Sequence, residues 1–116
     1  MNIPQNHYMK NTKWVFDEFL AFLLIYASHV DFDFSDEEKD EIEKIVGKDI
    51  FDEIYAHFIT LTDYQALEVI LSYRGIYFST VEEKELLFKE IHNLFNVDGD
   101  FSTLEKELLL FLKKLM

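Results

Sequence analysis

Two short acidic segments of this chain carry residue types that could bind a metal ion. Asp31 and Asp33 stand two residues apart in the first segment, and Asp98 and Asp100 stand two residues apart in the second. Oxygen ligands that alternate along a tight loop can converge on one point, which is how calcium-binding loops begin. The chemistry they suggest is the binding of a hard divalent cation, calcium or magnesium.

The two acidic segments are copies of one another. Residues 29–39 and 96–106 match at an offset of 67 positions in a Val, two Asp, a Phe, a Ser, a Glu and a Lys. In each copy a Ser is followed three residues later by a Glu, as in Ser35 and Glu38. That spacing predicts a capping box at the start of a helix. A repeated loop and helix start predicts a fold with two related halves.

Neither segment has the full pattern of an EF-hand. An EF-hand has Gly at its sixth position and a bidentate Glu at its twelfth, whereas counting from Asp98 gives Thr103 and Leu109. A loop with so few charged ligands would bind weakly, with a Kd on the order of 10⁻⁴–10⁻³ M. Alternatively, the carboxylates only stabilise the positive N-terminus of the following helix, by ~0.3–1 kcal/mol each. Both interpretations fit the residues.

The second acidic segment also carries a family resemblance. Asp-Gly-Asp-Phe at positions 98–101, followed by Glu105, resembles the TerB-like domains of tellurite-resistance proteins, and a diverged copy stands at Asp31, Phe34 and Glu38. A related domain forms the N-terminal part of a membrane-anchored J-domain co-chaperone. The resemblance covers nearly the whole chain. It implies an all-helical fold of two related halves, acidic loops that hold a divalent metal, and a role in stress response or assembly rather than catalysis.

The resemblance ranks the two loops as metal sites. The family has Gly after the first Asp, as in Gly99, but the first copy has Phe32 at that position. A Phe resists the positive backbone angle that Gly allows, so we expect the second loop to be the better site. The expected ligands are Asp98, Asp100 and Glu105 in the second loop and Asp31, Asp33 and Glu38 in the first.

The histidines add little to this site. His29 precedes the first Asp pair and could supply a nitrogen ligand, but Asn96 replaces it in the second copy. We expect His57 to be partly buried and His92 to lie on a helix surface.

The rest of the sequence predicts a compact all-α bundle of about six helices in two pseudo-repeated halves. The first helix is apolar all round from Phe19 onward, which is typical of a helix that the others surround. We expect a flexible arm over residues 1–10 and a single TerB-like domain over residues 11–116. The predicted helices begin near residue 11 or 12, after Ser35, near Lys48, after Thr62, after Thr80 and after Ser102, and Ile76, Tyr77 and Phe78 are predicted as a connector.

Composition excludes several classes of partner and location. The chain has 23 acidic and 11 basic residues and a net charge of −12, so it would repel nucleic acid and anionic membranes. It contains no Cys, and its longest apolar run, Phe19–Ala27, is far shorter than the ~20 residues of a membrane span. The N-terminal residues lack the pattern of a signal peptide. We therefore expect a cytoplasmic protein without a membrane span.

The sequence does not predict an enzyme. It has no Glu-x-x-His motif and no Gly-rich phosphate loop, and it shows no pattern of a nucleophile with a positioned base. The acidic run over residues 31–43 is either a solvated face or a docking surface for a basic protein.

The leading functional hypothesis is a non-enzymatic stress-response module, and the alternative is an acidic immunity or antitoxin-like protein that binds a basic partner. The alternative requires exposed aromatic side chains near the acids, and the candidates are Tyr55, Tyr64, Tyr73 and Tyr77. The sequence leaves the oligomeric state open.

Overall fold

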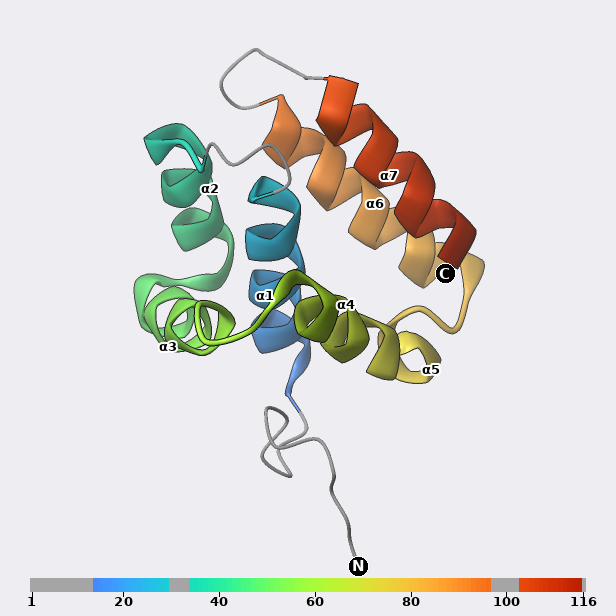
Figure 1. Cartoon of the computed structure of the whole chain (residues 1–116), viewed down its shortest axis with the longest axis horizontal. Helices are drawn as coiled ribbons and strands as arrows, with labels where there is room; N and C mark the ends of the chain where they lie inside the picture. The colour runs from blue at the N-terminus through green and yellow to red at the C-terminus, as the bar shows by residue number, and fades with distance from the viewer. Residues whose placement is uncertain (1–13, 30–33, 97–102, 116) are drawn as a thin grey trace, which may run out of the picture.

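The structure, a computed structural model, describes residues 14–29, 34–96 and 103–115, apart from the side chains of residues 103–105 and 115. The described residues form helices joined by short links and contain no strand, which confirms the predicted all-α class (Figure 1). The helices are α1 (Phe16–Ser28), α2 (Asp36–Val46), α3 (Lys48–Phe58), α4 (Asp63–Ser72), α5 (Arg74–Tyr77), α6 (Val81–Phe95) and α7 (Thr103–Leu115).

Helix α1 lies at the centre of the bundle, as predicted. It contacts α2, α3, α4 and α6, and every residue from Phe19 to Ile25 is buried. Figure 1 shows α2 and α3 on one side of α1 and the α6–α7 pair on the other. Each buried Phe or Leu of this helix stabilises the fold by about 1.5–3 kcal/mol relative to an exposed position.

Three predicted helix starts carry capping boxes, including the one predicted at Ser35. At α2, the Ser35 Oγ accepts the Glu38 N–H at 3.1 Å, and the Glu38 Oε1 accepts the Ser35 N–H at 3.3 Å. Reciprocal pairs of the same kind open α4 at Thr62 and α6 at Thr80. The box predicted at Ser102 lies outside the described residues.

Gly47 ends α2 and begins α3, as its position in the sequence suggested. Its φ of 95° lies in the region that favours glycine, and its N–H donates to the Glu43 carbonyl at 2.8 Å. This single residue turns the chain sharply, so α2 and α3 cross steeply on one side of α1 (Figure 1). We refer to these two helices and their turn as the α2–α3 hairpin.

The predicted start of the first helix was wrong. Trp14 and Val15 precede α1, which begins at Phe16, while residues 11–13 lie outside the described part of the chain. The Glu18 Oε1 accepts the Val15 N–H at 3.0 Å. A carboxylate at the third helical position therefore fixes this start.

The predicted connector at residues 76–78 was also partly wrong, because Ile76 and Tyr77 belong to the short helix α5. Tertiary contacts stabilise this turn: the Tyr77 hydroxyl donates to the Trp14 carbonyl, and the Trp14 N–H donates to the Tyr73 hydroxyl, each at 2.8 Å. Gly75, a residue type that often ends helices, lies within α5.

The buried faces of α4 and α7 differ in part from the predicted ones. The apolar spacing predicts that α4 buries Leu67, Ile70 and Leu71, and that α7 buries Leu104, Leu108, Phe111, Leu112 and Leu115. In α4, Ala66 and Val69 are buried beside Ile70, whereas Leu67 is half-buried. In α7, Phe111 was predicted to face the core but is 45% exposed. A helical stripe predicts which residues can be buried together, but the neighbouring helices decide which edge of the stripe is covered.

The internal repeat corresponds to two helix pairs. At the offset of 67, α1 aligns with residues 83–95 of α6, and α2 aligns with residues 103–113 of α7. Each repeat therefore consists of a helix, an acidic segment and a second helix. The helix that follows α2 is α3, and it contacts both members of the first pair.

Candidate functional site

Most of the predicted metal ligands lie outside the described residues. The undescribed positions are Asp31, Asp33, Asp98 and Asp100, together with the side chain of Glu105. Glu38 is described, and its side chain is 2% exposed in the first turn of α2, where its carboxylate caps the helix. Within the described residues, no three His, Asp or Glu side chains form a group that could hold a metal. Cation binding by the two loops stays a prediction.

His29 lies at the end of α1, next to the first acidic segment. Its Nδ1 is 2.8 Å from the Ile25 carbonyl, and its ring lies 4.7 Å from the Phe34 ring and 4.9 Å from the Phe58 ring, centroid to centroid. Phe34 packs against the core, as expected for the residue before the helix cap. These contacts hold the imidazole by one ring nitrogen and by its faces.

Ser28 was not singled out by the sequence, but the structure gives it an unusual environment. Its side chain is fully buried, and its Oγ has no hydrogen-bond partner among the described residues. Leaving a buried hydroxyl without a partner costs about 1–3 kcal/mol. The end of α1 therefore carries a destabilising polar group beside the first loop.

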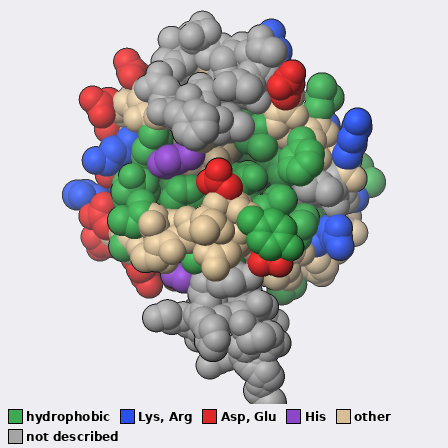
Figure 2. All heavy atoms as spheres, in the orientation of Figure 1, with side chains coloured by type: hydrophobic (Ala, Val, Ile, Leu, Met, Phe, Trp, Pro, Cys, Tyr) green, Lys and Arg blue, Asp and Glu red, His purple; other side chains and the backbone are tan. Residues whose placement is uncertain are grey.

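The α2–α3 hairpin, residues 36–58, carries a dense set of solvent-accessible carboxylates. They are Asp36, Glu37, Asp40, Glu41, Glu43, Asp49, Asp52 and Glu53. The Lys48–Asp52 pair, 2.9 Å between Nζ and Oδ2, is the one ion pair found among the described residues. Figure 2 shows acidic side chains gathered on the side where Figure 1 places α2 and α3, with some lysines among them and other lysines on the α6–α7 side.

The electrostatic field of this hairpin is strong enough to affect its own lysine. The hydrogen bond and the charge of Asp52 raise the pKa of the Lys48 ammonium, and the charges of Glu43 and Asp49 add to the effect. The remaining carboxylates of the hairpin surface make no ion pair with a described residue. The α2–α3 hairpin therefore presents largely uncompensated negative charge to solvent.

The four tyrosines considered for a protein interface differ in exposure. Tyr64 is 70% exposed, Tyr55 and Tyr77 are half-buried, and Tyr73 is 2% exposed. Burial raises the pKa of the Tyr73 hydroxyl. Of the four, only Tyr64 offers most of its ring to a partner.

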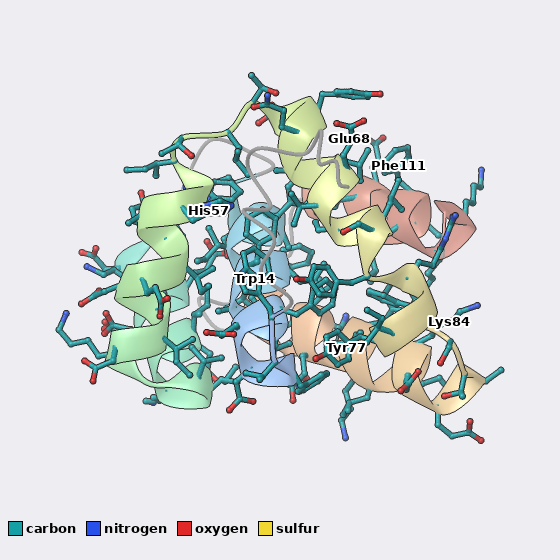
Figure 3. The ribbon with its side chains drawn as sticks, turned by 90° about the horizontal axis from the view of Figure 1, so that it is seen from below. Trp14, His57, Glu68, Tyr77, Lys84 and Phe111 are labelled. Carbon is teal, nitrogen blue, oxygen red and sulfur yellow. The ribbon has the colours of Figure 1, made fainter. Side chains whose placement is uncertain are left out.

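The buried tyrosines belong to an aromatic cluster that the sequence did not reveal. The Trp14 ring stacks on Tyr73, with 5.7 Å between centroids and 6° between planes, and it meets the edge of His57 at 5.7 Å. Tyr73 stacks in turn on Tyr77 at 5.9 Å. Figure 3 shows Trp14 between His57 and Tyr77. His57 is half-buried and His92 is exposed, as predicted. This cluster anchors the residues before α1 and has a structural role.

No family model, curated protein or solved structure matches this chain. The TerB-like resemblance therefore stays a prediction that rests on the repeated acidic segments. No helix of the described residues is long and apolar enough to cross a membrane.

Proposed function

We propose that this protein is a non-enzymatic, TerB-like docking module that binds a basic protein through its α2–α3 hairpin. The observation that carries the proposal is the set of exposed carboxylates on this hairpin, of which only Asp52 forms an ion pair among the described residues. A concentrated negative surface steers cationic partners toward it and raises the association rate.

The placement of these charges supports a role in binding. Asp36 and Asp40 stand four residues apart on α2, as do Glu37 and Glu41. Like charges at this spacing destabilise a helix by about 0.2–0.5 kcal/mol per pair. A hairpin that served only the fold would gain stability from alternating signs at these positions. Lys44, four residues after Asp40, offsets part of this cost, but nine acidic residues stand against three lysines over residues 36–58. The remaining surplus of negative charge supports a partner that neutralises it.

Two classes of protein would bind a basic partner through an acidic surface of this kind. A stress-response module would bind its partner reversibly, whereas an immunity or antitoxin-like protein would hold a basic toxin tightly. The observation that favours the second class is the exposed Tyr64, because tyrosine often anchors tight interfaces. The affinity for the purified partner separates the two classes.

The experiment compares two variants of equal charge. The hairpin variant carries Asp40→Asn, Glu41→Gln and Glu53→Gln, and its control carries Glu82→Gln, Glu85→Gln and Glu90→Gln on α6. Tagged wild type and both variants would be used to capture proteins at low and high salt, and a captured protein would be purified and titrated by calorimetry. We expect a basic protein that binds wild type and control, binds the hairpin variant at least about tenfold more weakly, and dissociates at high salt. Equal binding by the hairpin variant would contradict the proposal.

A second property, cation binding by the repeated loops, is favoured by the duplication of the Asp-x-Asp pattern. A cation that binds only the folded state raises the melting temperature by mass action. Melts in chelator and then in calcium or magnesium should show a rise that Asp98→Asn with Asp100→Asn removes. An equal rise in the melting temperature of the variant would show that the cation binds at another site.

A further inference from the structure

A shallow apolar groove lies between α6 and α7. It consists of two adjoining hollows of about 370 and 310 Å³, which share the side chains of His92, Leu109 and Lys113. Phe88 of α6 lines one hollow and Leu110 of α7 lines the other. Leu110 is 61% exposed and Leu109 is half-buried. Solvent therefore meets a continuous apolar floor that two helices build together.

The internal repeat relates this groove to a filled position in the other half of the molecule. Leu109 and Lys113 of α7 stand at the repeat positions of Ile42 and Val46 of α2. Ile42 and Val46 are buried in the same core as the apolar residues of α3. Of their counterparts, Leu109 is half-buried and Lys113 is exposed. The second helix pair thus leaves open a surface that the first pair buries.

The other wall of the groove shows the same relationship. Lys89 of α6 stands at the repeat position of Phe22 of α1. The Phe22 ring packs against Phe58 of α3, with 5.5 Å between centroids. Helix α3 therefore occupies, on α1 and α2, the place that corresponds to the open groove on α6 and α7.

The rim of the groove is positively charged in an otherwise acidic protein. Of the residues that the structure describes, Lys89, Lys106 and Lys113 line the two hollows, and Glu85 is the one carboxylate on their lining. The Lys113 ammonium lies 5.9 Å from the centre of the Phe88 ring. This border complements acidic side chains that flank an apolar ridge.

We propose that the α6–α7 groove binds an amphipathic helix of a partner protein, with large apolar side chains on one face and acidic residues beside them. Helix α3 shows the chemistry that fits such a place. Its buried face consists of Phe51, Ile54 and Phe58, and Asp52 and Glu53 are exposed beside it. Apolar residues at this spacing would enter the two hollows as knobs, while the acids would face the lysines.

Charge and burial argue against other occupants. If a second copy of the chain packed its own α6–α7 groove against this one, the lysines of the two grooves would face each other. The α3 helix of a second copy is committed to its own core, since Phe51, Ile54 and Phe58 are buried there. A membrane surface presents no fixed side chains that could fill the two hollows. An acidic helix alone matches both the apolar floor and the basic rim.

The probe is a stapled peptide with the α3 sequence, because a short unstapled helix is marginal in water. One control peptide replaces the residues equivalent to Phe51, Ile54 and Phe58 by Ser. A second control replaces those equivalent to Asp49, Asp52 and Glu53 by Lys. Each peptide would be titrated into the isotope-labelled full chain, and backbone amide shifts would be followed by NMR.

The variants test the groove without touching the core. Leu110→Ser and the pair Lys89→Glu with Lys113→Glu change its floor and rim. The matched controls are Leu86→Ser, at an exposed position outside the groove, and Lys84→Glu with Lys114→Glu. Loss of an interface anchor weakens binding by roughly tenfold.

We expect the probe to shift amides of α6 and α7, and each groove variant to weaken its binding by at least roughly tenfold while the controls change it less than about twofold. Both control peptides should bind more weakly than the probe. The proposal is overturned by no binding of the probe, by shifts confined to other helices, or by equal binding of the Lys-substituted peptide. It is also overturned if phosphatidylserine vesicles bind this face, or if the chain forms a dimer that Leu110→Ser abolishes.

Discussion

The two helix pairs of this protein share a repeat but differ in what surrounds them. In the first pair, α1 is buried at every position from Phe19 to Ile25, and α2 packs against α3, so the exposed positions of α2 are all charged residues. In the second pair, α6 is buried along one face and α7 keeps Leu110 and Phe111 exposed. The same local pattern therefore gives a core in one half and an open apolar surface in the other. The difference comes from the neighbouring helices, because the helix starts are alike in sequence.

The largest expected effect compares equivalent positions of α1 and α6. Phe19 is fully buried, whereas Leu86, its counterpart in the repeat, is 49% exposed. Phe19→Ala should lower the free energy of unfolding by about 3–5 kcal/mol, and Leu86→Ala should change it by less than about 0.5 kcal/mol. Urea denaturation measures both. Equal losses would mean that the two halves are buried alike.

The second prediction compares α2 with α7. Ile42 is fully buried, and Leu109, its counterpart, is half-buried on the groove floor. Ile42→Ala should cost about 2–5 kcal/mol, and Leu109→Ala should cost clearly less, because part of its side chain already meets water. Urea denaturation measures the loss in the free energy of unfolding for both variants. An equal or larger loss for Leu109→Ala would show that Leu109 is buried and that the groove floor is not open to solvent.

The third prediction tests whether the two repeats use the same helix cap. Ser35→Ala removes the hydroxyl that accepts the Glu38 N–H and should cost about 0.5–2 kcal/mol. The repeat predicts the same cost for Ser102→Ala. Thermal melts of both variants compare the two starts, and a neutral result at Ser102 would limit the capping box to the first repeat.

The fourth prediction concerns Ser28, whose counterpart in the repeat is the fully buried Phe95. Ser28→Ala removes a buried hydroxyl that has no partner among the described residues. The variant should therefore be more stable by about 1 kcal/mol. A drop in the melting temperature would show that this hydroxyl has a function in the folded protein.

Local signals explain how much of the fold could be predicted from sequence. The pairs Ser35–Glu38 and Thr80–Glu83 lie within one helical turn, so their hydrogen bonds follow from spacing alone. The cluster of Trp14 with Tyr73 and Tyr77 joins residues about 60 positions apart. No local pattern encodes such a contact, and for that reason α5 was missed.

The candidate sites were predictable to different degrees. The acidic composition of α2 and α3 can be counted in the sequence, but the scarcity of ion pairs depends on where side chains point. The groove could not be predicted, because Leu109 and Leu110 belong to an apolar run that fits a buried stripe equally well. Comparison with the buried Ile42 of the first repeat shows what the second half lacks.

The most direct test of the account is the salt dependence of the stability of the hairpin variant. If the charges of Asp40, Glu41 and Glu53 serve a partner, neutralising them should relieve repulsion and raise the free energy of unfolding at low salt by about 0.2–0.5 kcal/mol for each like-charge pair removed. The gain should fall at 1 M salt, where the Debye length is about 3 Å. The α6 control should show a smaller gain. A hairpin variant that is less stable than wild type at low salt would contradict the account, because the carboxylates would then hold the fold together.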